Sequence, residues 1–235
     1  MSGKIAVVTG SNKGIGLELV RQLSRAGVFT FLTSRNERKG LEAQAELAKE
    51  GIQAGFLHMD VTNLLSIHAA ARHIEEQHGK LDILVNNAGI LPDEDAESGG
   101  LIIPPDIVRS VFETNTLGPL QVCQVMLPLL RKSAAGRIIN ISSGMGSLTD
   151  MDGGYPAYRI SKTALNAVTR ILATELTDSG ITVNSVCPGW VKTDMGGPSA
   201  AIPTDQSANG ILPLLLSEAP GPTGQFLRDG KPVPW

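Results

Sequence analysis

Apolar runs alternate with amphipathic stretches along the whole chain. Short apolar runs predict buried strands at residues 4–10, 28–34, 54–61, 81–89, 136–143, 180–189 and 223–230. Apolar positions at helical spacing predict helices at 15–27, 36–51, 64–79, 106–132, 157–176 and 205–217. No linker or repeat interrupts this alternation, which is typical of a parallel sheet with helices on both faces. We expect one doubly wound α/β domain over residues 1–235, with a seven-stranded parallel sheet and 223–230 at its edge.

A glycine-rich turn, TGSNKGIG (9–16), joins the first predicted strand to the first helix. In a doubly wound sheet this turn faces the ligand crevice. Glycines let a diphosphate approach the backbone, and the free N–H groups of the first helical turn attract an anion. No Gly-Lys-Ser/Thr ends the turn, which disfavours a mononucleotide P-loop. We therefore expect a Rossmann-type dinucleotide site that includes Gly10, Asn12, Lys13, Gly14, Ile15 and Gly16.

The end of the second predicted strand indicates which dinucleotide binds. An NAD site usually carries an acidic residue there, which binds the ribose 2′-hydroxyl. This chain has Ser34 and Arg35 instead. An arginine attracts the 2′-phosphate of NADP, and Lys13 adds a cation nearby. We expect a preference for NADP(H) over NAD(H); the alternative is that both cations are merely solvated.

Tyr158 and Lys162 lie four residues apart, on one face of the predicted helix 157–176. The ammonium group is expected to lower the pKa of the phenol toward the working range of an acid–base catalyst. This spacing is common by chance and is weak evidence alone. Tyr155 has Arg159 at the corresponding position and precedes Pro156, so we place it outside the helix.

Other polar residues end the predicted strands at the same edge of the sheet. Ser142 and Ser143 follow the fifth strand, without the GxSxG context or His–Asp pattern of a hydrolase. The segment NNAG (86–89) ends the fourth strand. Asn115 lies inside a predicted helix between two threonines, a poor helical context that favours a local kink.

Together these residues resemble the short-chain dehydrogenase/reductases. The matching pieces follow the family order from residue 4 to about 195: TGxxxGIG (9–16), Asp-Val (60–61), NNAG, Asn115, the two serines, YxxxK (158–162), and Pro-Gly followed by threonine (188–189, 193). TGSNKGIG, TSRNERKG and GQFLRDGKPVPW look most like the carbonyl-reductase branch. The resemblance implies reduction of a carbonyl group with NADPH.

The resemblance also implies roles for single residues. Tyr158 would protonate the carbonyl oxygen, Lys162 would lower its pKa and hold the nicotinamide ribose, and Ser143, in preference to Ser142, would orient the carbonyl. Asn115 would hold a water that links Lys162 to a proton relay. The other implied cofactor contacts are Asp60, Val61, Asn87, Ala88 and Gly89 on the adenine side, and Pro188, Gly189, Val191 and Thr193 at the nicotinamide.

One departure from the branch concerns the spacing between Ser143 and Tyr158, which are only 15 residues apart. Monomeric animal carbonyl reductases carry a long insertion there, and it blocks the helix surface that other members use to pair. Because the insertion is absent, we expect a homodimer or homotetramer through helices 106–132 and 157–176.

The segment after Thr193 is rich in small residues, and we expect residues 195–222 to form a mobile lid over the substrate. It offers no charged anchor, so we expect a small or medium, fairly apolar ketone, aldehyde or quinone. Met195 and Trp190 are candidate pocket walls, although Trp190 suits the core equally well.

Composition excludes several other functions. The net charge of -3 gives no basic surface for nucleic acid or an anionic membrane. No long apolar run predicts a membrane span, and no leader pattern is present, so we expect a cytoplasmic protein. Cys123 and Cys187 lie in apolar surroundings and suit buried thiols in a reducing compartment. The four histidines are scattered without metal-ligand spacing, so no metal site is expected.

The leading hypothesis is therefore an NADPH-dependent carbonyl reductase. The same residues would catalyse alcohol oxidation in reverse, so the direction stays open. Reduction of a C=C bond conjugated to a carbonyl is an alternative, and so is an NADP-binding sensor without turnover. The substrate, the stereochemistry and the choice between dimer and tetramer are not indicated by the sequence.

Overall fold

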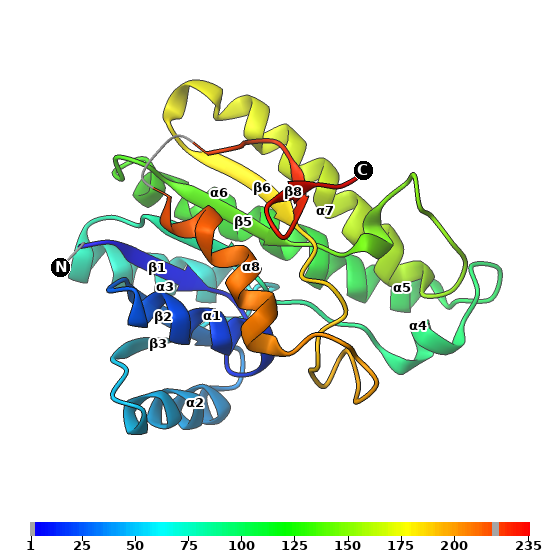
Figure 1. Cartoon of the computed structure of the whole chain (residues 1–235), viewed down its shortest axis with the longest axis horizontal. Helices are drawn as coiled ribbons and strands as arrows, with labels where there is room; N and C mark the ends of the chain where they lie inside the picture. The colour runs from blue at the N-terminus through cyan, green and yellow to red at the C-terminus, as the bar shows by residue number, and fades with distance from the viewer. Residues whose placement is uncertain (1–2, 218–220) are drawn as a thin grey trace.

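The computed structural model describes residues 3–217 and 221–235, which form a three-layer α/β structure around one sheet (Figure 1). All seven predicted strands are present, with tighter bounds than the apolar runs gave. The strands are β1 (Ile5–Val8), β2 (Phe29–Ser34), β3 (Ala54–His58), β4 (Ile83–Asn86), β5 (Arg137–Ile141), β6 (Thr182–Val186), β7 (Phe226–Arg228) and β8 (Lys231–Pro232).

The sheet has the order β3-β2-β1-β4-β5-β6-β7-β8. Strands β1 to β7 pair in parallel, so all of their carboxyl ends meet at one edge. The strand order reverses between β1 and β4. Such a switch point opens the crevice in which doubly wound folds bind their ligands.

The expected seven-stranded parallel sheet is corrected at one edge. A two-residue strand, β8, pairs antiparallel with β7, so 223–230 is not the edge strand. A strand this short shows no alternation of apolar and polar residues, and Pro232 disfavours a strand. Sequence periodicity therefore missed it.

Helices cover both faces of the sheet, as Figure 1 shows. Apolar residues of α1, α2 and α8 form one buried core cluster with the sheet, and those of α3 and α6 form the other. The helices are α1 (Gly14–Arg25), α2 (Glu37–Lys49), α3 (Leu64–His78), α4 (Asp93–Glu97), α5 (Pro105–Phe112), α6 (Gly118–Leu130), α7 (Pro156–Glu175) and α8 (Thr204–Leu216), with shorter turns η1 (Glu113–Leu117), η2 (Gly144–Gly146) and η3 (Thr177–Ser179).

The predicted helix 106–132 consists of three pieces. A π-helical turn, η1, joins α5 to α6, and Asn115 lies at its centre. The kink expected at Asn115 is therefore a widened turn, a feature frequent at functional sites.

Candidate active site

The glycine-rich turn has the shape that an anion site requires. Gly10 and Gly14 have φ values of +58° and +60°, which favour glycine strongly over other residues. A Cβ at Gly10 would lie 2.8 Å from the Cα of Ala88, and one at Gly16 would lie 2.5 Å from Nδ2 of Asn87. Lys13, at the N-cap of α1, makes no side-chain cap, so the first N–H groups of α1 are left for a ligand. This cradle fits a dinucleotide diphosphate.

The loop after β4 supports the glycine-rich turn. The hydroxyl of Thr9 accepts hydrogen bonds from the backbone N–H groups of Asn87 and Ala88, both at 2.9 Å. The Asn87 amide donates to the carbonyls of Thr9 and Gly10, at 2.8 and 3.0 Å. The side chain of Asn87 thus braces the cradle, although Asn87 also lines the cleft.

The two cations expected to meet a 2′-phosphate differ in their partners. Lys13 forms an exposed ion pair with Asp194, with Nζ 2.5 Å from Oδ2. This pair holds the pKa of Asp194 below its ordinary value, chiefly through the hydrogen bond from Lys13. Arg35 is exposed at the end of β2 and lines the cleft.

Tyr158 and Lys162 are both buried on α7 and face the same cleft. The Lys162 ammonium lies 5.5 Å from the centroid of the Tyr158 ring and donates to the carbonyl of Ile141 at 2.8 Å. The expected low pKa of the phenol is wrong for this structure. Burial raises the pKa of Tyr158 to about 12, and the nearby Ser143 hydroxyl offsets only part of the rise. Burial also lowers the pKa of Lys162 to about 8.

Ser143 and Ser142 have different surroundings. Ser143 accepts a hydrogen bond from the backbone N–H of Met145 at 3.2 Å and lies close enough to Tyr158 to affect its pKa. Ser142 also lines the cleft but is buried under α7, and within the described part of the chain its hydroxyl makes one long contact, 3.5 Å, with the carbonyl of Lys162. The geometry therefore favours Ser143 for contact with a substrate.

Asn115 does not line the cleft, and its side chain is held by protein groups. Its Oδ1 accepts from the N–H of Ile90 at 2.8 Å, and its Nδ2 donates to the carbonyl of Ile90 and to the Ser161 hydroxyl, at 2.9 and 3.1 Å. The side chain thus ties the loop after β4 to α7. Its expected role in holding a water stays a prediction.

The segment after β6 forms the outer wall. Its base is closed by a bridge between Val191 and Ile202. Trp190 is 57% exposed, lines the cleft and donates its Nε1–H to the carbonyl of Gly196, so it is a wall residue rather than part of the core. Within the expected lid, 195–222, α8 packs against α1 with Ile211 buried in the core, and residues 218–220 lie outside the described part. Closure of this segment over a substrate stays a prediction.

The predicted residues converge on one cleft of about 1180 Å³, at the carboxyl edge of the sheet. Gly16 and Asn115 lie behind its surface. The predicted residues that line it are Gly10, Asn12, Lys13, Gly14, Ile15, Arg35, Asp60, Val61, Asn87, Ala88, Gly89, Ser143, Tyr158, Lys162, Pro188, Gly189, Val191 and Thr193.

Sequence reasoning missed several residues that line the cleft, and three of them bear on its chemistry. Tyr155, set aside for its spacing, lines the cleft from the N-cap of α7, with a φ of +50°. Cys187 lines it too, and its sulfur accepts from the N–H of Gly144 at 3.2 Å. Arg228, on β7, gives the cleft a cation that the segment after Thr193 lacks. Of these three residues, only Cys187 could have been placed in the cleft from the sequence, because it lies at the end of a predicted strand.

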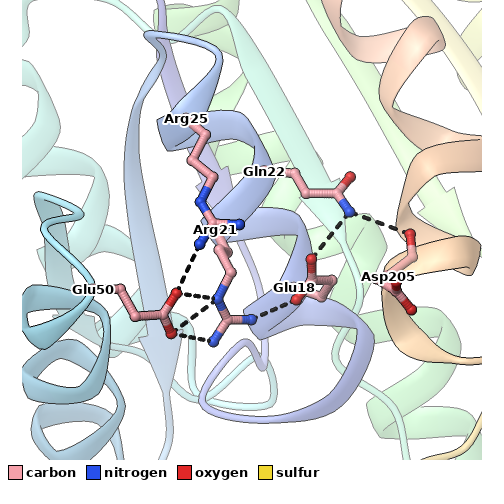
Figure 2. A network of polar contacts seen from close by, with 6 residues as sticks. All are labelled: Glu18, Arg21, Gln22, Arg25, Glu50 and Asp205. Carbon is pink, nitrogen blue, oxygen red and sulfur yellow. Dashed lines mark hydrogen bonds and ion pairs between the residues drawn. The ribbon is translucent and has the colours of Figure 1, made fainter.

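A polar network is centred on Glu18 and Arg21 of α1, which also line the cleft (Figure 2). The Arg21 guanidinium pairs with Glu18 of the same helix at 2.5 Å and with Glu50 at 2.8 Å. Gln22 donates to Glu18 and to the backbone carbonyl of Asp205, at 3.0 and 3.2 Å. The network joins α1 to the end of α2 and to the first turn of α8.

Comparison with known proteins identifies the family. Residues 4–202 match the short chain dehydrogenase family. The chain belongs to the short-chain dehydrogenase/reductase family. Its members are oxidoreductases, and this chain is carbonyl-reductase-like within the family.

Individual relatives extend over the whole chain. Mouse (Mus musculus) carbonyl reductase [NADPH] 1 is 33% identical over 282 aligned positions, which cover 100% of this chain and 99% of the mouse protein. Peppermint (Mentha piperita) (-)-isopiperitenone reductase is 31% identical, with 97% of each chain covered. The crystal structure of NADPH-bound carbonyl reductase from chicken fatty liver superposes with a TM-score of 0.88 at 33% identity, covering 99% of each chain. The mouse alignment is longer than this chain's 235 residues, so the relative carries inserted residues.

Within residues 3–217 and 221–235, no cluster of three or more His, Cys, Asp or Glu side chains suits a metal ion. In the same residues, no helix is both long and apolar enough to cross a bilayer.

Proposed function

We infer that the chain is an NADPH-dependent reductase of ketones, aldehydes or quinones. NADPH, when bound, supplies the hydride that reduces the carbonyl carbon. Tyr158 donates the phenolic proton to the carbonyl oxygen, and the Ser143 hydroxyl orients that oxygen by a hydrogen bond. The Lys162 ammonium stabilises the phenolate that remains. The observation that carries the proposal is the convergence of Tyr158, Lys162 and Ser143 on the cleft that also contains the glycine cradle.

The protonation states support reduction near neutral pH. The pKa of about 12 at Tyr158 keeps the phenol protonated, as a proton donor requires. The pKa of about 8 at Lys162 keeps most of the amine charged at pH 7. Alcohol oxidation by the same residues requires the phenolate and is therefore expected to need higher pH.

The direct test follows NADPH absorbance with a panel of ketones, aldehydes, quinones and an enone. We expect the wild-type protein to consume NADPH and Tyr158→Phe to lose at least about 100-fold in kcat, because the general acid is missing. NADPH binding by the variant should persist. An active Tyr158→Phe protein would disprove the assigned role of Tyr158.

The preference for NADPH over NADH is proposed from Arg35. This guanidinium is the exposed cation at the end of β2 and lines the cleft, whereas Lys13 is engaged by Asp194. We expect Arg35→Ala to raise the KM for NADPH about tenfold or more and to leave the KM for NADH nearly unchanged. The matched control is Arg38→Ala, an exposed cation that pairs with Glu42 on α2. Equal effects on both cofactors would refute the preference.

Two alternatives are separated by product analysis. The name of the peppermint relative, an isopiperitenone reductase, keeps reduction of a C=C bond next to a carbonyl open as a second activity. With an enone substrate, a saturated ketone would indicate C=C reduction and an allylic alcohol carbonyl reduction. Binding of NADPH with no turnover on any panel member would favour a sensor.

A homodimer or homotetramer through α5, α6 and α7 is also proposed. The outer face of α7 supports it, because Ile160 and Ile171 are 48% and 56% exposed there. Light scattering at micromolar concentration should give a mass of at least twice 24.8 kDa. A monomeric mass would contradict the proposal.

A further inference from the structure

The first turn of α7, which carries Tyr158, has no cap of its own. The N-cap residue, Tyr155, is in the left-handed conformation and makes no side-chain cap hydrogen bond. Pro156 follows and has no N–H to donate. The next two N–H groups, those of Ala157 and Tyr158, belong to buried residues and therefore need acceptors.

A carboxylate from a distant part of the chain supplies both acceptors. Oδ1 of Asp95 accepts from the N–H of Ala157 at 2.9 Å, and Oδ2 accepts from the N–H of Tyr158 at 2.8 Å. Asp95 is fully buried, with 0% of its surface exposed. Among the described residues, no lysine or arginine pairs with this carboxylate, so its charge is balanced by the two amides and the positive end of α7.

Asp95 also belongs to the segment that forms one wall of the cleft. It lies on α4, a few residues after Ile90 and Leu91, which line the cleft. Asn115 fixes Ile90 through two backbone hydrogen bonds, and Asp95 fixes the end of the same segment against α7. The cleft wall and the helix of the proton donor are therefore joined at two points.

We propose that Asp95 is a positioning residue, which holds the start of α7 so that the Tyr158 phenol meets the substrate carbonyl. The inference rests on the proposed role of Tyr158. Both carboxylate oxygens are needed, because each accepts a different N–H of the first turn. A shift of the helix start moves the phenol against the carbonyl, and an error of about 1 Å in such a geometry costs on the order of 100-fold in rate.

The test compares Asp95→Asn with Glu94→Gln, a change at the exposed neighbouring residue. In Asp95→Asn the side-chain amide keeps one acceptor oxygen but turns an NH2 group toward the other N–H. We expect kcat to fall between about 10- and 100-fold in Asp95→Asn, with the KM for the carbonyl and the affinity for NADPH within about twofold of wild type. Glu94→Gln should match wild type. A folded Asp95→Asn protein with unchanged kcat would overturn the proposal.

A second variant covers the case in which Asp95→Asn does not fold. Asp95→Glu keeps the charge and both oxygens but adds one methylene, which displaces the helix start. We expect it to fold and to lose kcat by a smaller factor than Asp95→Asn. Unchanged kcat in Asp95→Glu, with a changed melting temperature, would mean that Asp95 serves stability alone.

A readout independent of activity uses the ionisation of Tyr158. The chain has two tyrosines, so in a Tyr155→Phe background tyrosinate absorbance reports Tyr158 alone. Burial raises the pKa of Tyr158 to about 12, and Ser143, Lys162 and Cys187 stay in place around it. We expect Asp95→Asn to lower this pKa by about one unit or more, because a displaced helix start admits water. An unchanged titration would overturn the proposal, whereas wild-type inactivity on every carbonyl would overturn only the proposed function.

Discussion

Tyr158 and Lys162 are both buried, and burial moves their pKa values in opposite directions. The phenol is raised to about 12 and the ammonium is lowered to about 8. In each case burial favours the neutral form of the group, because a charged group loses hydration in the interior. Between these two values the phenol is still protonated while the amine loses its charge. The amine is therefore the group whose titration should limit the reaction at alkaline pH.

The pH dependence of reduction follows from these two groups. We expect kcat/KM to be nearly constant below about pH 7.5 and to fall, approaching tenfold per pH unit, above about pH 8, where the Lys162 ammonium deprotonates. The measurement is a pH–rate profile with circular dichroism at each pH to confirm folding. Lys162→Arg, which keeps its charge, should lack the alkaline decline. A wild-type profile that stays flat to about pH 10 would contradict the assignment.

Residues in short motifs could be predicted from the sequence, and residues that act across the fold could not. Tyr158 and Lys162 are four residues apart, so helical geometry alone places them together. Asp95 reaches α7 across 62 residues, and Arg228 reaches the cleft from a strand near the other end of the chain. The sign of the Tyr158 pKa shift was also out of reach, because it depends on burial.

The elements around the glycine cradle are held by charged side chains rather than by apolar packing alone. Figure 2 shows Arg21 between Glu18 and Glu50, with Arg25 adding a second contact to Glu50 at 3.0 Å. Glu50 raises the pKa of Arg21 further, mainly by its hydrogen bond. Glu18 is only 11% exposed in its side chain, and Arg21 is its ion-pair partner.

Removal of Arg21 should leave the mostly buried Glu18 carboxylate without its cation. We expect Arg21→Met to lower the free energy of unfolding by ~1–3 kcal/mol, as measured by urea denaturation. The double variant Glu18→Gln/Arg21→Met should recover part of the loss, because the buried charge is then absent. If the loss in the double variant equals the sum of the losses in Glu18→Gln and Arg21→Met, the two residues do not interact.

The helices and strands could be predicted where the element is long enough to show a clear pattern of apolar positions. Strands β1, β2, β4, β5 and β6 are mostly buried, β3 is only half-buried, and α1, α3 and α7 show clear apolar faces. The π-turn at Asn115 was visible only as a poor helical context, since its geometry depends on the bonds from Asn115 to Ile90 and Ser161. The packing of α8 on α1 inside the predicted lid could not be read from the sequence, because it depends on contacts between distant elements.

The two ends of the parallel strands have separate roles in the whole molecule. The carboxyl edge holds the cleft, whereas the amino edge carries a buried carboxylate, Asp82. It accepts from the N–H of Ile5 at 2.8 Å and from the Ser133 hydroxyl at 2.6 Å, and it pairs with Lys80. Burial alone would raise the pKa of Asp82, but these bonds outweigh it and the pKa lies below its ordinary value.

Asp82 should stabilise the fold without affecting the site. Because its folded pKa is lowered, its contribution is present above the unfolded pKa of about 4 and is lost as pH falls through the folded value. We expect Asp82→Asn to cost ~1–3 kcal/mol in urea unfolding at pH 7 and less at about pH 3, with kcat unchanged. Asp106→Asn, at an exposed carboxylate, is the control. Equal losses at both pH values would contradict the assignment.

The fold class could be predicted from the alternation of strands and helices alone. The packing of the segment around Trp235 could not. The last residues return to the active-site side: the carbonyl of Trp235 accepts hydrogen bonds from Ser147 and from Thr149, at 3.1 and 3.0 Å, just beyond Ser143. The Trp235 ring also stacks on Phe226 of β7, with ring centroids 5.7 Å apart.

During synthesis, then, the loop beside Ser143 leaves the ribosome almost ninety residues before the group that anchors it. The glycine cradle can assemble early, from the first strands and helices to emerge. A variant that lacks Trp235 would keep the glycine cradle but lose this anchor, so we expect it to bind a dinucleotide and to turn over poorly.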